Sequence, residues 1–311
     1  MTPGTLLVLV LLAAFALAGL ALAALLALAW HLGLRRAALT SLDLVGLRLL
    51  PAAGALLVML AVVLPAFLSF EPEQEQETAG PWLILLAVIG AACLVAGMWR
   101  AWRAVRAART LLSQYRLDPR GAGQGTPVHI VEATEPLVAV VGAWRPCVVA
   151  TGSVRAACDG EEFHAVLAHE AAHVAARDNL KLLLLIAAPD ALSLTSLAAS
   201  LTERWRAAAE SEADARATGS DSGRRLALAS ALIKLARLVS RREVPRPLLG
   251  MSVAGDDVPA RVRALLEPPA RPMPPRLLAA LSISVLLIPL LALPRYALLH
   301  ELIERLVGLG R

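Results

Sequence analysis

Residues 165–180 read AVLAHEAAHVAARDNL and contain an HExxH motif, formed by His169, Glu170 and His173. The alanines around it favour a helix, which we expect to begin near Gly160. Two histidines four residues apart lie on one face of a helix, so both imidazoles can bind one Zn²⁺ ion. Glu170 would then lie beside the metal, where it can take a proton from an activated water. The alternative is two histidines that simply face water or the core.

A third metal ligand is expected from a second helix further along the chain. Glu210 and Asp214 are four residues apart and share one face of that helix, whereas Glu212 points away and is expected to face solvent. We predict Glu210 as the third ligand and Asp214 as a carboxylate that accepts the free N–H of a ligand histidine. Asp178 could orient a ligand in the same way, or it could pair with its neighbour Arg177.

Two short β-prone runs, residues 136–141 and 147–154, come before the motif and are separated by five residues. This pattern predicts a β-hairpin. An extended peptide substrate would add alongside the edge strand of that hairpin, because main-chain pairing gives affinity without a sequence requirement.

The stretch between the two ligand helices, residues 180–201, is apolar enough to be scored as a membrane span. Only 36 residues separate His173 from Glu210, however, and a single crossing between them would place two ligands of one metal on opposite sides of the bilayer. We therefore expect a helical hairpin that belongs to the core or lies against the membrane.

The chain as a whole is unusually apolar. Of its 311 residues, 58% are hydrophobic and 18% are charged, and the mean hydropathy is +0.65; ordinary soluble domains have about 25% charged residues. Four apolar runs are long enough to cross a bilayer: residues 6–30, 49–70, 82–98 and 277–293. The fold class expected is a mainly α-helical, polytopic membrane protein with four transmembrane helices and an α+β domain inserted between the third and the fourth.

The distribution of arginine predicts the orientation. Arginines lie between the first two runs, whereas residues 71–80 hold four glutamates and no Lys or Arg. By the positive-inside rule, the N-terminus is outside and residues 99–275 are cytoplasmic. Residues 99–116 combine two tryptophans with arginines at steps of three and are expected to form an interfacial helix of that domain. Residues 276–311 would hold the fourth span and a short amphipathic tail. We expect a multi-pass protein of a bacterial-type inner membrane.

Composition also limits the partners. All but two of the 30 basic residues are arginines, and the net charge is +5. Because they flank apolar runs, they indicate contact with the headgroups of the lipid bilayer and no direct binding of nucleic acid. The three cysteines show no CxxC spacing, so no cysteine zinc site is expected. No predicted span has an ionisable residue in its interior, which disfavours a channel or transporter.

Three segments together resemble the BlaR/MecR-type integral-membrane metallopeptidases, metallopeptidase family 56. They are residues 141–149 (VGAWRPCVV), 165–180 and 210–214 (ESEAD), with weaker similarity over 226–236 and 261–266. The resemblance implies a gluzincin-type zinc peptidase with the ligands His169, His173 and Glu210 and the base Glu170. It also implies a cytosolic protein substrate, for example a transcriptional repressor, and a role in signal transduction.

Two departures qualify what the resemblance implies. No SxxK motif occurs, and only a short stretch follows the last predicted span, so we expect no penicillin-binding sensor domain and no covalent β-lactam sensing. This family often has cysteine at the position of Ala213. The alanine found here resembles the HtpX-type peptidases instead. Those place two membrane helices between HExxH and the glutamate, for which 36 residues are too few. An HtpX-like quality-control peptidase and a non-catalytic zinc-containing signalling subunit remain the alternatives; the latter would have no use for Glu170.

Overall fold

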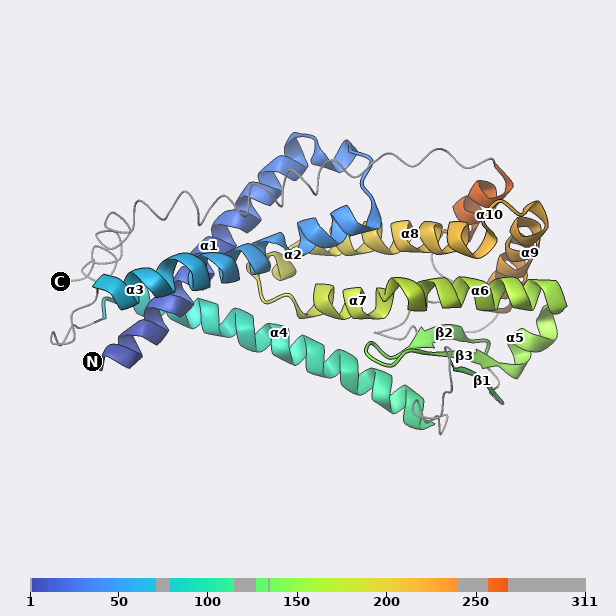
Figure 1. The fold of residues 1–311 in the computed structure, drawn as a ribbon, viewed down its shortest axis with the longest axis horizontal. Helices are drawn as coiled ribbons and strands as arrows, with labels where there is room; N and C mark the ends of the chain where they lie inside the picture. Colours follow the sequence, from blue (N-terminus) through green and yellow to red (C-terminus); the bar gives the residue numbers. More distant parts are fainter. Residues whose placement is uncertain (1, 71–78, 115–126, 134, 240–256, 268–311) are drawn as a thin grey trace. The chain divides into compact units, whose positions relative to one another are not determined.

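The computed structural model describes residues 2–70, 79–114, 127–133, 135–239 and 257–267 (Figure 1). Their contacts divide them into two compact units. The first comprises residues 2–99 and 187–204, and the second comprises residues 100–186 and 205–267 within the described ranges. The predicted fourth span and the amphipathic tail lie outside the described residues, so both stay predictions.

The first unit contains the long apolar helices. They are α1 (Pro3–Leu32), α2 (Ser41–Val58), a π-helical turn (Met59–Val63), α3 (Leu64–Phe70) and α4 (Pro81–Gln114), which extends into the second unit. Three segments are long and apolar enough to cross a membrane: Pro3–Leu32, Ser41–Ser69 and Pro81–Gln114. The first and third contain the predicted runs 6–30 and 82–98, and the second covers the predicted run 49–70 except for its last residue. By length and composition, the chain is therefore suited to a membrane.

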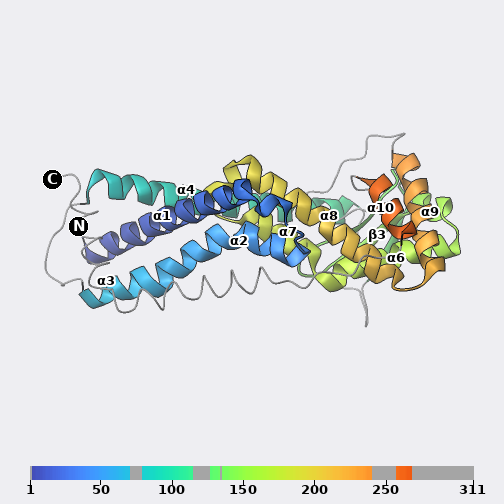
Figure 2. The same ribbon diagram turned by 90° about the horizontal axis from the view of Figure 1, so that it is seen from above.

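Apolar side chains from α1, α3 and α4 pack together in this unit. Figure 2 shows the backbones of these helices. The cluster includes Val10 of α1, Phe67 of α3 and Leu83 of α4. Gly90 brings α4 so close to the Leu12 carbonyl that a Cβ atom would clash with it. Glycine at this position thus permits close packing of two helices, as small residues do in membrane bundles.

The boundary expected at Met98 is absent. α4 continues without interruption to Gln114, so the predicted third span and the described part of the predicted interfacial helix form one element. The reason is local: residues 99–114 contain many alanines and arginines, which favour helix, and no glycine or proline that would end it. Trp99 and Trp102 are exposed, and the Arg106 guanidinium lies over the Trp102 ring at 5.1 Å.

A buried ion pair lies within the first unit. Arg48 of α2 donates to Asp190 Oδ2 at 2.9 Å and to Ser193 Oγ at 2.6 Å, and the two charged side chains are 3% and 1% exposed. Arg48 is one of the arginines between the first two predicted runs, where a loop was expected, but α2 begins at Ser41 and includes it. The candidate span Ser41–Ser69 begins before the predicted run 49–70 and so includes charged residues at its start, whereas the predicted run itself contains none.

The stretch over residues 180–201 forms two helices with a break between them, as expected. α7 (Asp178–Ala187) is followed by a short 3₁₀ turn (Ala191–Leu194), and α8 (Ser196–Thr218) begins directly after it. Neither α7 nor α8 is a candidate membrane span. The break coincides with Pro189, and the Asp190 carboxylate accepts the backbone N–H of Ser193.

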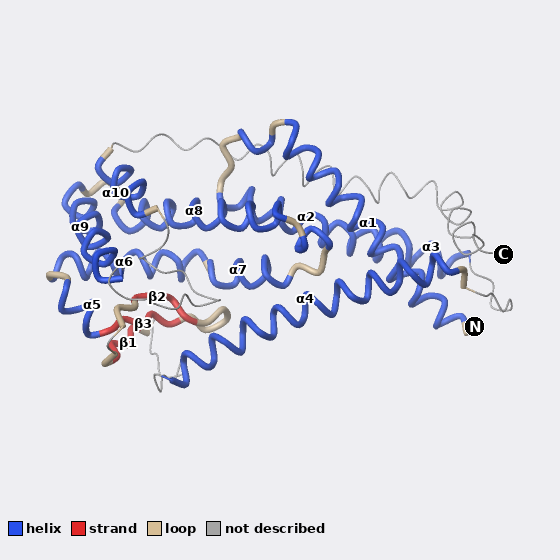
Figure 3. The backbone as a smooth tube through the Cα atoms, turned by 180° about the vertical axis from the view of Figure 1, so that it is seen from behind, coloured by secondary structure: helices blue, strands red, loops and turns tan. Residues whose placement is uncertain are grey.

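The second unit is built on a three-stranded sheet (Figure 3). Its strands are β1 (Val128–Val131), β2 (Val138–Val141) and β3 (Cys147–Thr151), in the order β1-β3-β2. The predicted hairpin is confirmed: β2 and β3 are antiparallel, with Val141 opposite Cys147. Gly142 begins the loop with a φ of +94°, a conformation that L side chains rarely adopt. β1, which pairs parallel to β3, was not expected.

Helices form the core together with this sheet. They are α5 (Gly152–Ala157), α6 (Gly160–Ala176), α9 (Ser222–Val239) and α10 (Val258–Leu266). Val166 of α6 and Leu232 of α9 are fully buried in one cluster with residues of β2 and β3. A capping box between Asp159 and Glu162 starts α6, so the helix containing the motif begins where the sequence predicts it.

Glu162 also ties α6 to α9. It is buried and accepts hydrogen bonds from Ser230 Oγ and Lys234 Nζ, both at 2.6 Å. Burial alone would raise the pKa of Glu162, but these hydrogen bonds outweigh it, and the pKa is lowered. A carboxyl group with a lowered pKa stabilises the fold at pH values above its unfolded-state pKa of about 4.3, and this contribution is lost as the pH falls.

Glu162→Gln is therefore expected to destabilise the protein at pH 7 and to have a smaller effect at about pH 3, because the contribution is lost as the pH falls through the lowered pKa of the folded state. The measurement is the midpoint of denaturant unfolding for parent and variant at both pH values. Glu161→Gln, on the exposed side of the same helical turn, is the matched control and should change neither midpoint. An equal loss at both pH values would contradict the ionic role of Glu162.

Candidate metal centre

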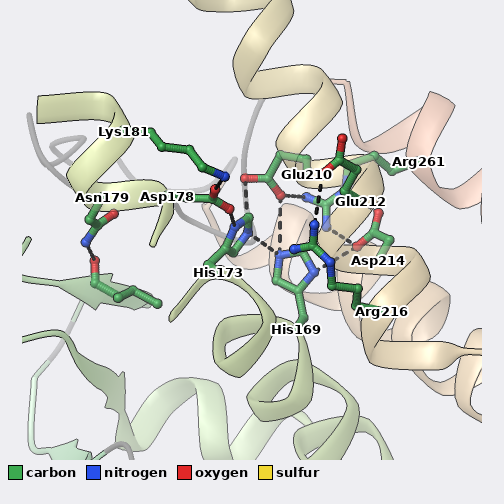
Figure 4. A network of polar contacts seen from close by, with 11 residues as sticks. His169, His173, Asp178, Asn179, Lys181, Glu210, Glu212, Asp214, Arg216 and Arg261 are labelled. Atoms are coloured by element: carbon green, nitrogen blue, oxygen red, sulfur yellow. Dashed lines mark hydrogen bonds and ion pairs between the residues drawn. The ribbon is translucent and has the colours of Figure 1, made fainter. Parts of the chain in front are cut away.

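α6 brings the three motif residues to one buried place, and Figure 4 shows its two histidines. His169 and Glu170 are fully buried and His173 is 1% exposed. The two imidazole rings meet edge to face, with centroids 4.7 Å apart, and their Nε2 atoms are separated by 3.1 Å. The helical spacing of the motif thus converges two nitrogen donors on one point.

Glu210 of α8 completes this group. Its Oε2 atom lies 3.3 Å from His169 Nε2, and its Oε1 atom lies 3.7 Å from His173 Nε2. Tetrahedral zinc with bonds of about 2.0–2.1 Å places its ligand atoms about 3.3 Å from one another. The spacing of the three groups, and their nitrogen and oxygen donors, therefore fit a zinc ion, and the structure brings together the ligands that the sequence predicts.

Each of these histidines has a carboxylate on its other ring nitrogen. His169 Nδ1 lies 2.9 Å from Asp214 Oδ1, and His173 Nδ1 lies 2.9 Å from Asp178 Oδ2. The contact of His173 has hydrogen-bond geometry, whereas that of His169 is a close ion-pair contact. Carboxylates placed in this way fix which nitrogen faces the metal and increase its basicity. Both predicted orienting residues are thus beside a histidine, and the open question about Asp178 has a geometric answer: it contacts His173 and, at 2.8 Å, Lys181.

The turn between α6 and α7 explains why Asp178 reaches His173. Arg177 adopts a left-handed conformation with φ 55° and ends α6, and α7 starts at the next residue. Asn179 then donates to the carbonyls of Val140 and Gly142 at 2.9 and 3.1 Å. Since β2 is buried along its length and Asn179 occupies its Val140 carbonyl, the edge expected to pair with a peptide is not free at this end.

Glu170 is the least satisfied group of the centre. Neither of its buried carboxylate oxygens has a hydrogen-bond partner among the described residues. Burial raises the pKa of Glu170 to about 7. A buried carboxylate without partners is costly and is seldom kept for structure alone, and a pKa near neutrality suits a group that accepts and returns a proton.

The charges of the centre balance a divalent cation. Four carboxylates and two fixed cations gather there: Glu170, Asp178, Glu210 and Asp214, with Lys181 and Arg261. The sum is two negative charges when Glu170 is ionised and one when it is protonated. Burial opposes protonation of His173, but Asp178 and Glu210 raise its pKa to about 9; the pKa of His169 is raised against burial by Asp214 and Glu210. The acidic surroundings thus attract two positive charges to this point.

Arg261 of α10 was not predicted as a site residue, although it begins the segment 261–266 that weakly resembles the BlaR/MecR-type enzymes. Its guanidinium contacts Glu210 and Asp214, and the side chain is 8% exposed. No spacing rule connects a residue on α10 with acids about 50 positions earlier, so the contact could not be read from a local pattern. One signal was present: Arg261 shares a helix face with Leu265, a core residue, and an arginine on a buried face requires an acidic partner.

Comparison with known families agrees with this arrangement. Residues 128–243 match the model of Peptidase family M48, a segment that includes the sheet, α6 and the acids of α8. M48 peptidases are metallopeptidases and generally depend on zinc. A search of curated proteins found no match. The similarity supports a zinc metallopeptidase family, and the BlaR/MecR type stays a prediction.

Proposed function

We propose that this chain is a membrane-bound, zinc-dependent endopeptidase that hydrolyses peptide bonds of a protein substrate. The observation that carries the proposal is the group formed by His169, His173 and Glu210, with the unpartnered carboxylate of Glu170 beside it. The M48 match over residues 128–243 supports the same reaction class. A structural zinc site would have no use for a buried, unpartnered acid next to its first ligand.

The residues divide the chemistry among them. When bound, zinc would polarise a water molecule and lower its pKa towards neutrality. Glu170 takes the proton of that water and afterwards delivers it to the leaving nitrogen of the peptide, a role for which a pKa near 7 is suited. Asp214 and Asp178 hold the two imidazoles in the orientation that directs Nε2 inwards.

Within this class we favour the BlaR/MecR type. The 36 residues between His173 and Glu210 contain no candidate membrane span, which agrees with the layout that the resemblance implies. A cytosolic protein, such as a transcriptional repressor, is then the proposed substrate, and the distribution of arginine supports a cytoplasmic catalytic unit. The HtpX-like alternative is favoured by Ala213 and is compatible with the M48 match, but it expects two membrane helices in this segment.

The test is hydrolysis of a mixed peptide library by the full chain, purified in mild detergent with zinc added. We expect new amino termini within the peptides, their loss with 1,10-phenanthroline and their return when zinc is restored. Cleavage that is insensitive to the chelator would point to a contaminating protease. A folded, zinc-loaded chain that cleaves no peptide in the library would count against a broad endopeptidase.

A further inference from the structure

One arginine contacts two acids of the metal centre at once. Arg261 Nη1 lies 2.7 Å from Glu210 Oε2, while its Nε and Nη2 atoms donate to both oxygens of Asp214 at 2.8 and 2.6 Å. Glu210 and Asp214 are one helical turn apart on α8, so the planar guanidinium spans the turn (Figure 4). All three side chains are buried or nearly so.

We propose that Arg261 is a positioning residue that orients two of the three metal ligands, Glu210 directly and His169 through Asp214. The proposal rests on the proposed metal site. Asp214 Oδ1 is shared between Arg261 Nη2 and His169 Nδ1, so the position of the guanidinium decides where the imidazole points. Similarly, Glu210 Oε2 lies 2.7 Å from Arg261 Nη1 and 3.3 Å from His169 Nε2, so it contacts both side chains.

The chemistry of arginine matters for this role. Arginine presents several donors in a rigid plane, whereas lysine is a point charge on a flexible stem and cannot hold two carboxylates in fixed relative positions. The other histidine illustrates the contrast. Asp178, the carboxylate beside His173, contacts Lys181 through one bond, and that lysine side chain is 19% exposed. A simple ion pair joining α10 to α8 would not need contacts with both acids.

α10 is itself firmly placed. Leu265 is buried in the core cluster, and Val258 and Val262 pack against it. Asp257, in a left-handed conformation, caps the helix by accepting the backbone N–H of Ala260. The backbone that carries Arg261 is therefore fixed by apolar packing independent of the metal centre, as a group that orients others should be.

Arg261→Lys keeps the charge and removes the fork, so it tests positioning directly. We expect its zinc affinity, measured by competition with a chelator of known affinity, to fall by about 10- to 100-fold, the usual effect of losing an outer hydrogen bond of a ligand. With Co²⁺ in place of zinc, the visible absorption spectrum should also change. Arg263→Lys, exposed on the same helix, is the matched control and should leave both measurements unchanged.

A second comparison keeps the proposal testable if Arg261→Lys alters folding. When Asp214→Asn is combined with Arg261→Lys, the double variant should lose much less affinity than the sum of the two single losses, because Arg261 acts partly through Asp214. Additive losses, or parent-like zinc affinity and cobalt spectrum in Arg261→Lys, would overturn the proposal. Since peptidase activity is not the readout, a zinc-binding but inactive parent would contradict only the proposed function.

Discussion

Changing Glu170 to glutamine is expected to reduce peptide hydrolysis by about 10²- to 10⁴-fold, the usual contribution of a general base, while zinc remains bound. Glutamine has nearly the same shape as glutamate but cannot take a proton from the attacking water. The ligand atoms on His169, His173 and Glu210 are not altered by the change. The measurements are kcat on a peptide cleaved by the parent and zinc content on the same samples.

Stability provides an internal check on this variant. The parent buries a carboxylate that has no partner among the described residues, and a neutral amide costs less to bury. The variant should therefore unfold no more easily than the parent without metal. Glu161→Gln serves as the activity control, because Glu161 is exposed and lies nine residues before Glu170 on α6. Retained activity in Glu170→Gln would contradict the proposed base, and loss of zinc would instead make Glu170 a ligand.

The second large effect is expected from Glu210→Ala. Glu210 supplies the anionic ligand of the group, so its removal should weaken zinc binding by more than the roughly 10- to 100-fold that follows loss of an outer hydrogen bond. Zinc bound after dialysis should fall far below that of the parent, and hydrolysis should fall with it. Both are measured on protein whose helical circular dichroism matches the parent.

Glu212→Ala is the matched control for this change. Glu212 lies two residues further along α8 and forms an exposed ion pair with Arg216 at 2.9 Å, in agreement with the expectation that it faces away from the site. Zinc retained in Glu210→Ala but lost in Glu212→Ala would show that the wrong face of α8 has been assigned to the metal. Equal retention in both would remove Glu210 from the ligand set.

Local patterns explain which parts of the structure could be predicted. The capping box at Asp159, the spacing of His169 and His173, and the hairpin with its five-residue loop each depend on residues close in sequence. The position of Glu210 and Asp214 on one face of α8 likewise follows from their spacing of a single helical turn. The resulting geometry agrees with the predicted site, although the assigned roles of these residues remain predictions.

The features that were missed depend on distant contacts or on the absence of a stop signal. β1 is a four-residue strand whose partner, β3, lies about 20 positions away, so no turn marks it. Arg261 meets its acids only after α9 has been placed. α4 continues through Met98. A change from apolar to basic residues determines whether a helix is more stable in lipid or in water, but it does not end the helix. Orientation, substrate and the fourth span stay predictions.

The zinc content of the purified full chain, measured by elemental analysis in detergent, tests the central claim most directly. The arrangement of His169, His173 and Glu210 predicts about one zinc ion per chain, as expected for a site with three protein ligands. A folded chain that retains no zinc, even after zinc has been supplied and the excess removed, would contradict the metal centre and with it the peptidase function.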